Sequence, residues 1–317
     1  MRLAGAGVEC GHHDFSGSTV KYSAEIAQSH MAALLSALRP REGMHPSVLA
    51  GVELMCGTRS MERHPVVYTP SIVILVQGRK RGYLGEQVYT YDQHNYLVTS
   101  VPMPFECETE ASPEHPLLGL SLKVEPALLA ELLLDMDEPL PDTSTSPRGI
   151  YATPLNAALG GAVIRLLECL ADPVDARMLG PQIVREIIYR VLRGEQGGAL
   201  RALATRHSHS GRIGKVLRRV HAEFSCPLDV DTLAAEASMS VSAFHHHFKA
   251  VTSTSPLQYV KTIRLHQARL LMVHEGLNAG IAAQRVGYES PSQFSREFKR
   301  LFGANPSTEA ARVRAAL

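Results

Sequence analysis

The sequence has few cysteines and no long hydrophobic run. An odd, dilute set of thiols without a Cys-x-x-Cys pair indicates reduced cysteines and a cytoplasmic location. The five are Cys10, Cys56, Cys107, Cys169 and Cys226. No apolar stretch approaches the ~18 residues that a membrane-spanning helix needs, and the first residues lack the charged start and apolar core of a secretory signal. We therefore expect no membrane partner.

Motifs for catalysis and metal binding are missing as well. There is no nucleophile elbow and no phosphate-cradling glycine loop, which argues against an enzyme. Histidines cluster at 12–13, 207–209 and 245–247. The first two clusters lie in segments expected to be irregular. Consecutive residues of a helix point ~100° apart, so the third cluster cannot converge on one ion. The sequence predicts no metal and no cofactor.

Charge is unevenly divided along the 317 residues, a length that suits two domains of ~100–200 residues each. The composition, 45% hydrophobic and 20% charged, is typical of a soluble globular protein. Residues 212–317 contain 14 Lys and Arg against 8 Asp and Glu, a net charge of +6, whereas residues 1–211 have a net charge of −5. The basic last third predicts a polyanionic partner for that part of the chain.

The first two thirds of the chain predict a domain in which strands are followed by helices. Residues 1–22, rich in Gly, Ser and His, are expected to be a disordered lead-in, and an apolar pattern predicts a helix over about 23–38. Between 46 and 124, short runs rich in Val, Ile, Tyr and Thr alternate with turn signals, which indicates an antiparallel sandwich or barrel. Gly85-Glu86 lies between two alternating runs and is a candidate hairpin turn.

Amphipathic helices are predicted after the β-rich segment, over 126–136, about 154–171 and about 180–194. Their apolar faces must be buried against another surface. Packing on the β-rich segment and packing in a homodimer interface both satisfy this requirement, so the two alternatives stay open. Residues 196–211 follow the last of these helices and are interpreted as an interdomain linker, so the first domain spans 23–195.

The basic third contains a two-fold repeat. Residues 278–306 indicate two short helices joined by a tight turn, and residues 229–256 contain a second copy. In both copies a Phe-x-x-x-Phe-Lys run is followed by a proline eight positions after its second phenylalanine, where the chain must leave the second helix. The apolar residues of each second helix share one face and leave polar side chains on the other, which can read base edges in a major groove.

A long helix is predicted between the copies, from Ser255-Pro256 to about His274. Its ~18 residues span ~27 Å at 1.5 Å per residue. That length can hold the two second helices roughly one DNA turn, ~34 Å, apart. The sequence therefore predicts double-stranded DNA as the partner of residues 212–317. A single copy would fit an ordinary amphipathic surface helix equally well. The presence of two matched copies disfavours that alternative.

Residues 212–317 resemble the DNA-binding domain of AraC/XylS-type transcription regulators. The resemblance rests on the run Arg-Leu-x-x-Ala-Arg-Leu-Leu at 264–271 and on Ile281-Ala282, Gly287-Tyr288, Phe294-x3-Phe298 and Gly303-x-Asn305-Pro306. Residues 46–135 resemble the cupin-like N-terminal module of some of these regulators, on Pro70-Ser71, Val76-Gln77-Gly78-Arg79-Lys80, Leu84-Gly85 and Glu110-Ala111-Ser112-Pro113-Glu114. The resemblance implies an α+β multidomain fold, in which an antiparallel cupin-like β-barrel with flanking helices precedes an all-α double helix-turn-helix domain.

Matched position by position, the resemblance implies that the second helix of each copy contacts DNA bases. They fall on Ser242, His245 and His246 in the first copy and on Ser292, Gln293 and Arg296 in the second. A neutral histidine makes a weaker, single contact to guanine than a bidentate arginine makes, so the second copy is expected to contribute more. Phosphate contacts position a protein without reading sequence, and they are expected from Lys249, Lys299 and Arg300.

The β-rich segment is expected to sense a small-molecule effector, because a small β-barrel can hold one ligand in its mouth. Metal-dependent cupins carry His-x-His and Glu on adjacent strands, and this pattern is absent. Glu106 and Glu108 flank Cys107 and should disfavour its thiolate, so a buried structural thiol and an electrophile sensor are the alternatives there. The candidate polar contacts to the effector are His64, Tyr83, Tyr89, Tyr91 and Cys107.

Together these features predict a transcription regulator that is not an enzyme, in which effector binding alters DNA binding or polymerase recruitment. The expected partners are double-stranded DNA, a small-molecule effector and a second copy of the chain in a homodimer, with RNA polymerase as a further candidate. The alternatives are a ligand-independent DNA-binding protein and a cupin-type enzyme fused to a DNA-binding domain.

Overall fold

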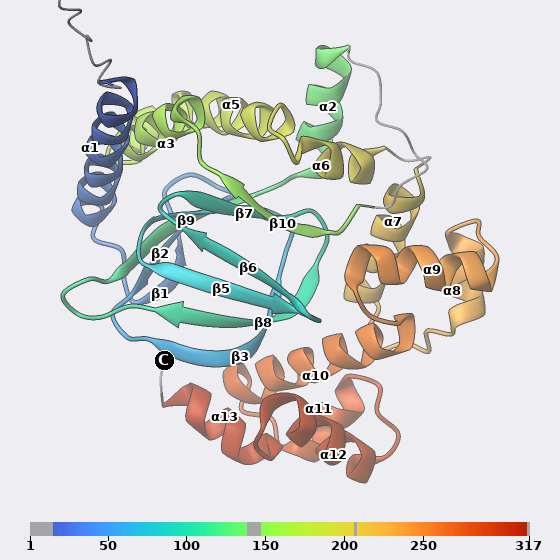
Figure 1. The fold of residues 1–317 in the computed structure, drawn as a ribbon. Helices are drawn as coiled ribbons and strands as arrows, with labels where there is room; N and C mark the ends of the chain where they lie inside the picture. Colours follow the sequence, from blue (N-terminus) through green and yellow to red (C-terminus); the bar gives the residue numbers. More distant parts are fainter. Residues whose placement is uncertain (1–14, 138–146, 206–207, 316–317) are drawn as a thin grey trace, which may run out of the picture.

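Two antiparallel sheets form the body of the first domain in the computed structural model (Figure 1), which describes residues 15–137, 147–205 and 208–315. The larger sheet has six strands in the order β1-β2-β9-β4-β7-β10, and the smaller has four in the order β3-β8-β5-β6. The strands are β1 (Gly43–Pro46), β2 (Val52–Gly57), β3 (Met61–Tyr68), β4 (Ser71–Gln77), β5 (Arg79–Leu84), β6 (Gln87–Asp92), β7 (Asn95–Thr99), β8 (Met103–Glu110), β9 (Leu117–Lys123) and β10 (Ile150–Pro154). The predicted α+β architecture is confirmed. The described strands pair as two sheets, however, and not as one closed barrel.

The two sheets enclose an apolar interior, and the larger sheet also has an apolar outer face. Ile72 and Ile74 of β4 belong to the core on the outer face, whereas Val73 and Leu75 belong to the core between the sheets. This explains why β4 is a continuous apolar run, as expected for a strand buried on both faces. The predicted hairpin at Gly85 is confirmed, since Leu84 pairs with Gln87 across a two-residue loop.

Helices cover the outer face of the larger sheet (Figure 1). The predicted helices over 126–136, 154–171 and 180–194 are present, although the start of the second is the end of strand β10. Their buried faces pack on the sheet and on one another. The helices of this domain are α1 (Phe15–Ala37), α2 (Pro126–Met136), α3 (Ala157–Cys169), α4 (Pro173–Met178), α5 (Gly180–Leu192) and α6 (Gly197–Ala204).

Two predicted boundaries of the first domain need correction. The lead-in over 1–22 ends earlier, because α1 already begins at Phe15; a helix anchored by buried Met31 and Leu35 propagates toward its N-terminus at little cost. The remainder of that lead-in, with His12-His13, lies outside the described residues. The linker over 196–211 is also largely helical, since α6 buries Leu200 completely. Its glycine pair hides this helix in the sequence, but Gly197 is needed because a Cβ there would lie 2.0 Å from the Leu192 carbonyl oxygen.

The second domain, residues 208–315, is built from helices alone (Figure 1). The predicted long helix and both copies of the predicted helix pair are present. Among the described residues of the whole chain, no helix is both long and apolar enough to cross a bilayer. The helices are α7 (His209–Ala222), α8 (Val230–Glu236), α9 (Val241–Thr252), α10 (Pro256–His274), α11 (Ala279–Arg285), α12 (Pro291–Phe302) and α13 (Pro306–Arg314).

Candidate nucleic-acid interface

The first helix-turn-helix unit consists of α8 and α9. Asp229 caps α8 by accepting a hydrogen bond from Thr232 N at 2.8 Å, and Ser240 caps α9 by accepting one from Ala243 N at 3.3 Å. Such caps satisfy backbone donors that have no partner within the helix. Phe244 of α9 is fully buried in the core that α9 shares with α7 and α10. The polar face of α9 is thereby fixed toward solvent.

The second unit repeats this construction with α11 and α12. Asn278 caps α11 and Ser290 caps α12, and Pro291 occupies the first turn of α12, where the missing N–H costs no helical hydrogen bond. Phe294 and Phe298 are buried. The i, i+4, i+7 spacing predicts Leu301 as the third member of this apolar stripe, but the structure buries Phe302, eight positions after Phe294, and leaves Leu301 half-buried.

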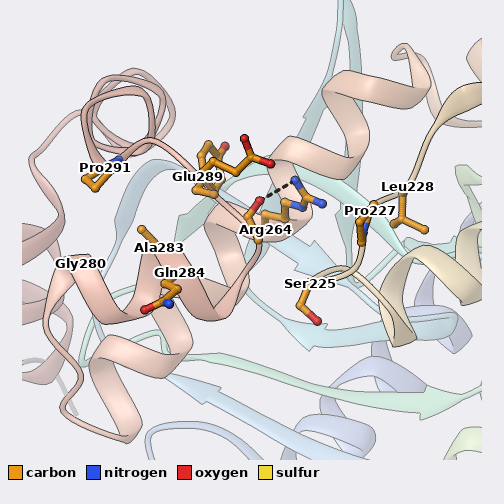
Figure 2. A pocket seen from close by; sticks show the side chains of 11 residues that line it. Ser225, Pro227, Leu228, Arg264, Gly280, Ala283, Gln284, Glu289 and Pro291 are labelled. Atoms are coloured by element: carbon orange, nitrogen blue, oxygen red, sulfur yellow. Dashed lines mark hydrogen bonds between the residues drawn. The ribbon is translucent and has the colours of Figure 1, made fainter.

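Helix α10 joins the two units and carries Arg264, which fixes their relative position. The guanidinium group donates to the carbonyl oxygens of Phe224 at 2.8 Å, Cys226 at 2.9 Å and Gly287 at 3.1 Å. The first two acceptors lie in the loop before α8, and the third lies in the turn between α11 and α12. Figure 2 shows Arg264 between these two segments. One side chain therefore ties both units to the long helix.

Gly287 makes this close approach between the units possible. Its φ is +84°, a conformation that residues with a Cβ rarely adopt. A Cβ at this position would also lie 2.6 Å from the carbonyl oxygen of Ser225, in the loop before α8. The turn of the second unit thus needs glycine for two independent reasons.

A hollow of about 770 Å³ opens between the two units beside Arg264 (Figure 2). One wall comes from the loop before α8 and the other from α11 and the start of α12. The capped N-terminal ends of α11 and α12 border it. Its lining includes Ser225, Pro227, Leu228, Gly280, Gln284 and Pro291.

The structure places nearly all the predicted DNA-contacting side chains on the exposed faces of α9 and α12. No described residue forms an ion pair with Arg296, Lys299 or Arg300, so these charges are available to a ligand. The exposed residues are Ser242, His245, His246 and Lys249 on α9 and Ser292, Arg296, Lys299 and Arg300 on α12.

Gln293 differs from the other predicted contacts because it is half-buried and already has a partner. Its amide nitrogen donates to Glu297 Oε1 at 3.2 Å. Glu297 also pairs with Lys261 of α10 at 2.8 Å and accepts from the Tyr288 hydroxyl at 2.7 Å. These three partners lower the pKa of Glu297 against the opposing effect of its burial. Gln293 is therefore drawn toward the protein, contrary to its expected place on the solvent face.

The helical domain is docked on the first domain along a seam. The Tyr259 hydroxyl of α10 donates to the Pro102 carbonyl oxygen at 2.6 Å, and Gly149 N donates to the Val251 carbonyl oxygen at 2.9 Å. The Arg269 guanidinium also reaches the Pro65 carbonyl oxygen of β3 at 3.4 Å. A buried cluster continues from between the sheets into the first unit. Docking nevertheless leaves the polar faces of α9 and α12 exposed.

The predicted effector contacts are only partly brought together. Tyr91 and Cys107 point between the sheets and are buried, with the Tyr91 hydroxyl 3.4 Å from the Cys107 sulfur. Tyr68, which the sequence interpretation missed, lies 3.1 Å from Tyr91, hydroxyl to hydroxyl. Burial raises the pKa of Tyr68 and of Tyr91, so both are neutral hydrogen-bonding groups. Lys80, also missed, extends its amino group over the Tyr68 ring at 5.8 Å.

Tyr83 lies on the opposite side of the smaller sheet. It pairs with Glu106 on the neighbouring strand, donates its hydroxyl to Glu108 at 2.5 Å and carries the Arg63 guanidinium over its ring. Because alternate residues of a strand face opposite ways, Tyr83 cannot share a site with Cys107. The structure therefore does not bring Tyr83 together with the other predicted effector contacts.

Tyr89 and His64 lie on the same face of the smaller sheet as Cys107. Tyr89 is half-buried, packs against the core between the sheets and accepts a hydrogen bond from Arg148 at 3.2 Å. His64 pairs with Cys107 in the strand register, and burial is the main cause of its lowered pKa. Within the described part of the chain, no group of three or more His, Cys, Asp or Glu residues could hold a metal ion.

Comparison with known proteins agrees with this arrangement. Residues 48–199 match the model of the AraC-type transcriptional regulator N-terminus, and residues 233–312 match that of a helix-turn-helix domain. The chain is 34% identical over 103 residues to the RCS-specific HTH-type transcriptional activator RclR of Escherichia coli, a match that covers 32% of this chain and 36% of RclR. It is 26% identical over 158 residues to the HTH-type transcriptional regulator CdhR of Pseudomonas aeruginosa, covering 50% of this chain and 47% of CdhR.

The matched part spans between about a third and a half of the length of these relatives. Among solved structures, an apo variant of ToxT from Vibrio cholerae superposes with a TM-score of 0.55 at 10% sequence identity, covering 86% of this chain and 99% of the ToxT chain. At that identity the likeness concerns the fold alone.

A β-rich domain followed by two helix-turn-helix units on one long helix defines a two-domain transcription regulator. The chain belongs to the AraC-type transcription regulators. This assignment agrees with the prediction that the chain is not an enzyme.

Proposed function

We propose that the chain binds duplex DNA through α9 and α12, and that a small-molecule effector bound in the first domain alters this binding. The observation that carries the proposal is a pair of exposed polar helix faces held at one relative position by α10 and Arg264. Two helices on one rigid spacer can enter successive major-groove segments on one side of a duplex. The net charge of +6 on residues 212–317 favours the same partner.

In this proposal the second unit contributes most of the base readout. Arg296 is exposed and unpaired among the described residues, and a bidentate arginine–guanine contact discriminates by ~1–3 kcal/mol. Gln293 would first have to leave Glu297, which reduces what it can gain from a base. Ser242, His245, His246 and Ser292 supply weaker contacts. Phosphates are held by Lys249, Lys299 and Arg300.

The test begins with selection of bound sequences from a pool of random duplexes by the full chain. Fluorescence anisotropy on the selected duplex should then show Arg296→Ala raising Kd by ~5- to 150-fold, the equivalent of ~1–3 kcal/mol. Arg285→Ala is the matched control, because Arg285 is exposed on α11 and pairs on the surface with Glu275. An equal loss in both variants would reject a specific contact by Arg296.

The proposed effector site lies between the sheets, beside the chain of polar groups formed by Tyr68, Tyr91 and Cys107, with Tyr89 and His64 nearby. Tyr91→Phe removes one hydroxyl without changing the apolar volume. In a reporter strain that carries the selected operator, this variant should respond less to a compound that changes expression through the wild type. If no compound in a broad metabolite panel alters DNA affinity, the alternative of a ligand-independent DNA-binding protein is favoured instead.

We further propose a homodimer formed through the helices of 154–194. Val174 is 55% exposed, Met178 64% and Leu179 52%, and they lie next to one another on and beside α4. Met178→Glu should lower the apparent mass in analytical ultracentrifugation if this patch is the interface.

The cytoplasm is the proposed location, and RNA polymerase is a further candidate partner at the bound promoter.

A further inference from the structure

A second hollow, of about 500 Å³, lies on the seam between the two domains. Loops at the rim of the sheets form one side, and the first turns of α2 form another. The third side comes from α6 and α7, so both domains contribute walls. We call this hollow the seam pocket. None of its lining residues belongs to the proposed effector site between the sheets or to the polar faces of α9 and α12.

The floor of the seam pocket is apolar. Val101, Val124, Leu129 and Leu200 line it, and each is less than 9% exposed. A volume of this size falls in the range of small-molecule sites, ~300–1,000 Å³, which are typically apolar with a few polar groups that set orientation.

The mouth of the seam pocket is positively charged. Arg218 of α7 is exposed and lines the pocket, and no described residue forms a hydrogen bond or ion pair with it. Lys123 also lines the pocket, where it pairs at 2.7 Å with Glu125, another lining residue. The start of α2 adds to the field, because Glu125 at its N-cap makes no side-chain capping bond. The N–H of Ala127 has no acceptor within the helix, because it lies in the first turn of α2.

We propose that the seam pocket binds a small carboxylate with a short apolar body. The carboxylate would face Arg218 and the first turn of α2, and the apolar body would cover Val101, Leu129 and Leu200. An arginine fork matches a carboxylate in geometry as well as in charge. A neutral molecule of the same shape would fill the floor and leave the guanidinium without a partner.

Binding at the seam pocket stabilises the docked arrangement of the domains. Pro102 lines the pocket, and its carbonyl oxygen accepts the hydrogen bond from Tyr259 that joins α10 to the first domain. Val101, also in the lining, lies against Gly149, whose N–H bonds to Val251 at the end of α9. A ligand that touches both walls binds the docked form better than the separated form, and it shifts the equilibrium by that difference.

The test uses the full chain and matched pairs of probes: hexanoate against hexanamide, and benzoate against benzamide. Thermal unfolding at millimolar probe should show Tm rising with each carboxylate and little change with each amide, because a ligand of the native state stabilises in proportion to its occupancy. Hydrogen exchange should show the amide of Gly149 better protected with carboxylate bound. Neither measurement requires DNA, so failure here is separate from failure of the proposed DNA binding.

Three variants locate the site. Arg218→Met should weaken carboxylate binding at least tenfold, and Ala130→Trp should abolish it by filling the pocket from an exposed helical position. Lys215→Met, also on α7 but outside the lining, should bind as the wild type does. The proposal is overturned if no carboxylate raises Tm, if amides act equally, or if the shift survives Arg218→Met but is lost in Tyr91→Phe. The last result would place the ligand between the sheets.

Discussion

Replacing Arg264 with methionine should loosen the two helix-turn-helix units from each other while leaving each unit folded. Methionine keeps an unbranched apolar stem, so the change chiefly removes the three hydrogen bonds to the carbonyl oxygens of Phe224, Cys226 and Gly287. A hydrogen bond to a charged group contributes ~1.5–3 kcal/mol. Because Arg264 is half-buried and its bond to Cys226 is exposed, we expect a loss of about 2–4 kcal/mol in unfolding free energy, less than the simple sum.

The consequence for DNA binding follows from the linkage of the two units. Binding by one unit presents the other to its half-site at a high effective concentration, and a looser connection lowers that concentration. Anisotropy titrations should show Arg264→Met losing at least ~10-fold in affinity for a duplex with both half-sites. On a duplex with one half-site scrambled, affinity should change little. Arg285→Met controls for removal of a guanidinium from the same domain. Equal losses on the two duplexes, or no loss on either, would refute the assignment of Arg264 as the link.

Three further outcomes are expected. Gly287→Ala should lower the free energy of unfolding by ~1–3 kcal/mol in urea titrations, because alanine is strained at φ +84° and its Cβ meets the Ser225 carbonyl oxygen. Gly276→Ala is the control. Gly276 has a φ of +69° but open space around it, so this change should cost less. Burial lowers the pKa of His266 in the folded chain to about 3, below the unfolded value of ~6.5. Below pH ~6.5 the unfolded chain binds a proton that the folded chain does not bind. The free energy of unfolding should therefore fall by about 2 kcal/mol between pH 7.5 and 5.0. His266→Leu should reduce this slope and leave the part that comes from buried His221, whose pKa is lowered to about 4; an unchanged slope would remove His266 from the account. Iodoacetamide should label exposed Cys226 well before Cys107, which is 1% exposed; rapid native-state labelling of Cys107 in peptide maps would favour the electrophile-sensor alternative.

The helical domain could be predicted closely because its signals are local. Asp229, Ser240, Ser255, Asn278 and Ser290 all cap the helices that follow them, and a cap with an adjacent proline or apolar stripe is visible within a few residues of sequence. The proposed spacing of the two units depends on α10 alone, whose length is also a local property. Arg264 was missed as a link because its acceptors are backbone carbonyls that only the tertiary fold brings together.

The first domain was harder to predict because its pairing is not local. Strands β3 and β8 lie within the predicted β-rich segment 46–124 but are hard to recognise in the sequence, since each contains a proline and charged residues. Pro65 is tolerated on β3 because β3 is an edge strand of the smaller sheet. The tyrosines show the same limit: strand alternation separates Tyr83 from Tyr89 and Tyr91, but the face that points inward is set by the partner sheet. The sequence therefore names the candidate effector contacts but does not determine which of them point between the sheets.

Hydroxyl-radical footprinting of the full chain on its selected duplex tests the central claim most directly. Two exposed helices on one rigid spacer should protect two patches on one side of the duplex, separated by about one helical turn of ~10.5 base pairs. Arg296→Ala should weaken protection mainly at the patch assigned to α12. A single protected patch, or two patches that lie on opposite sides of the duplex, would contradict the account.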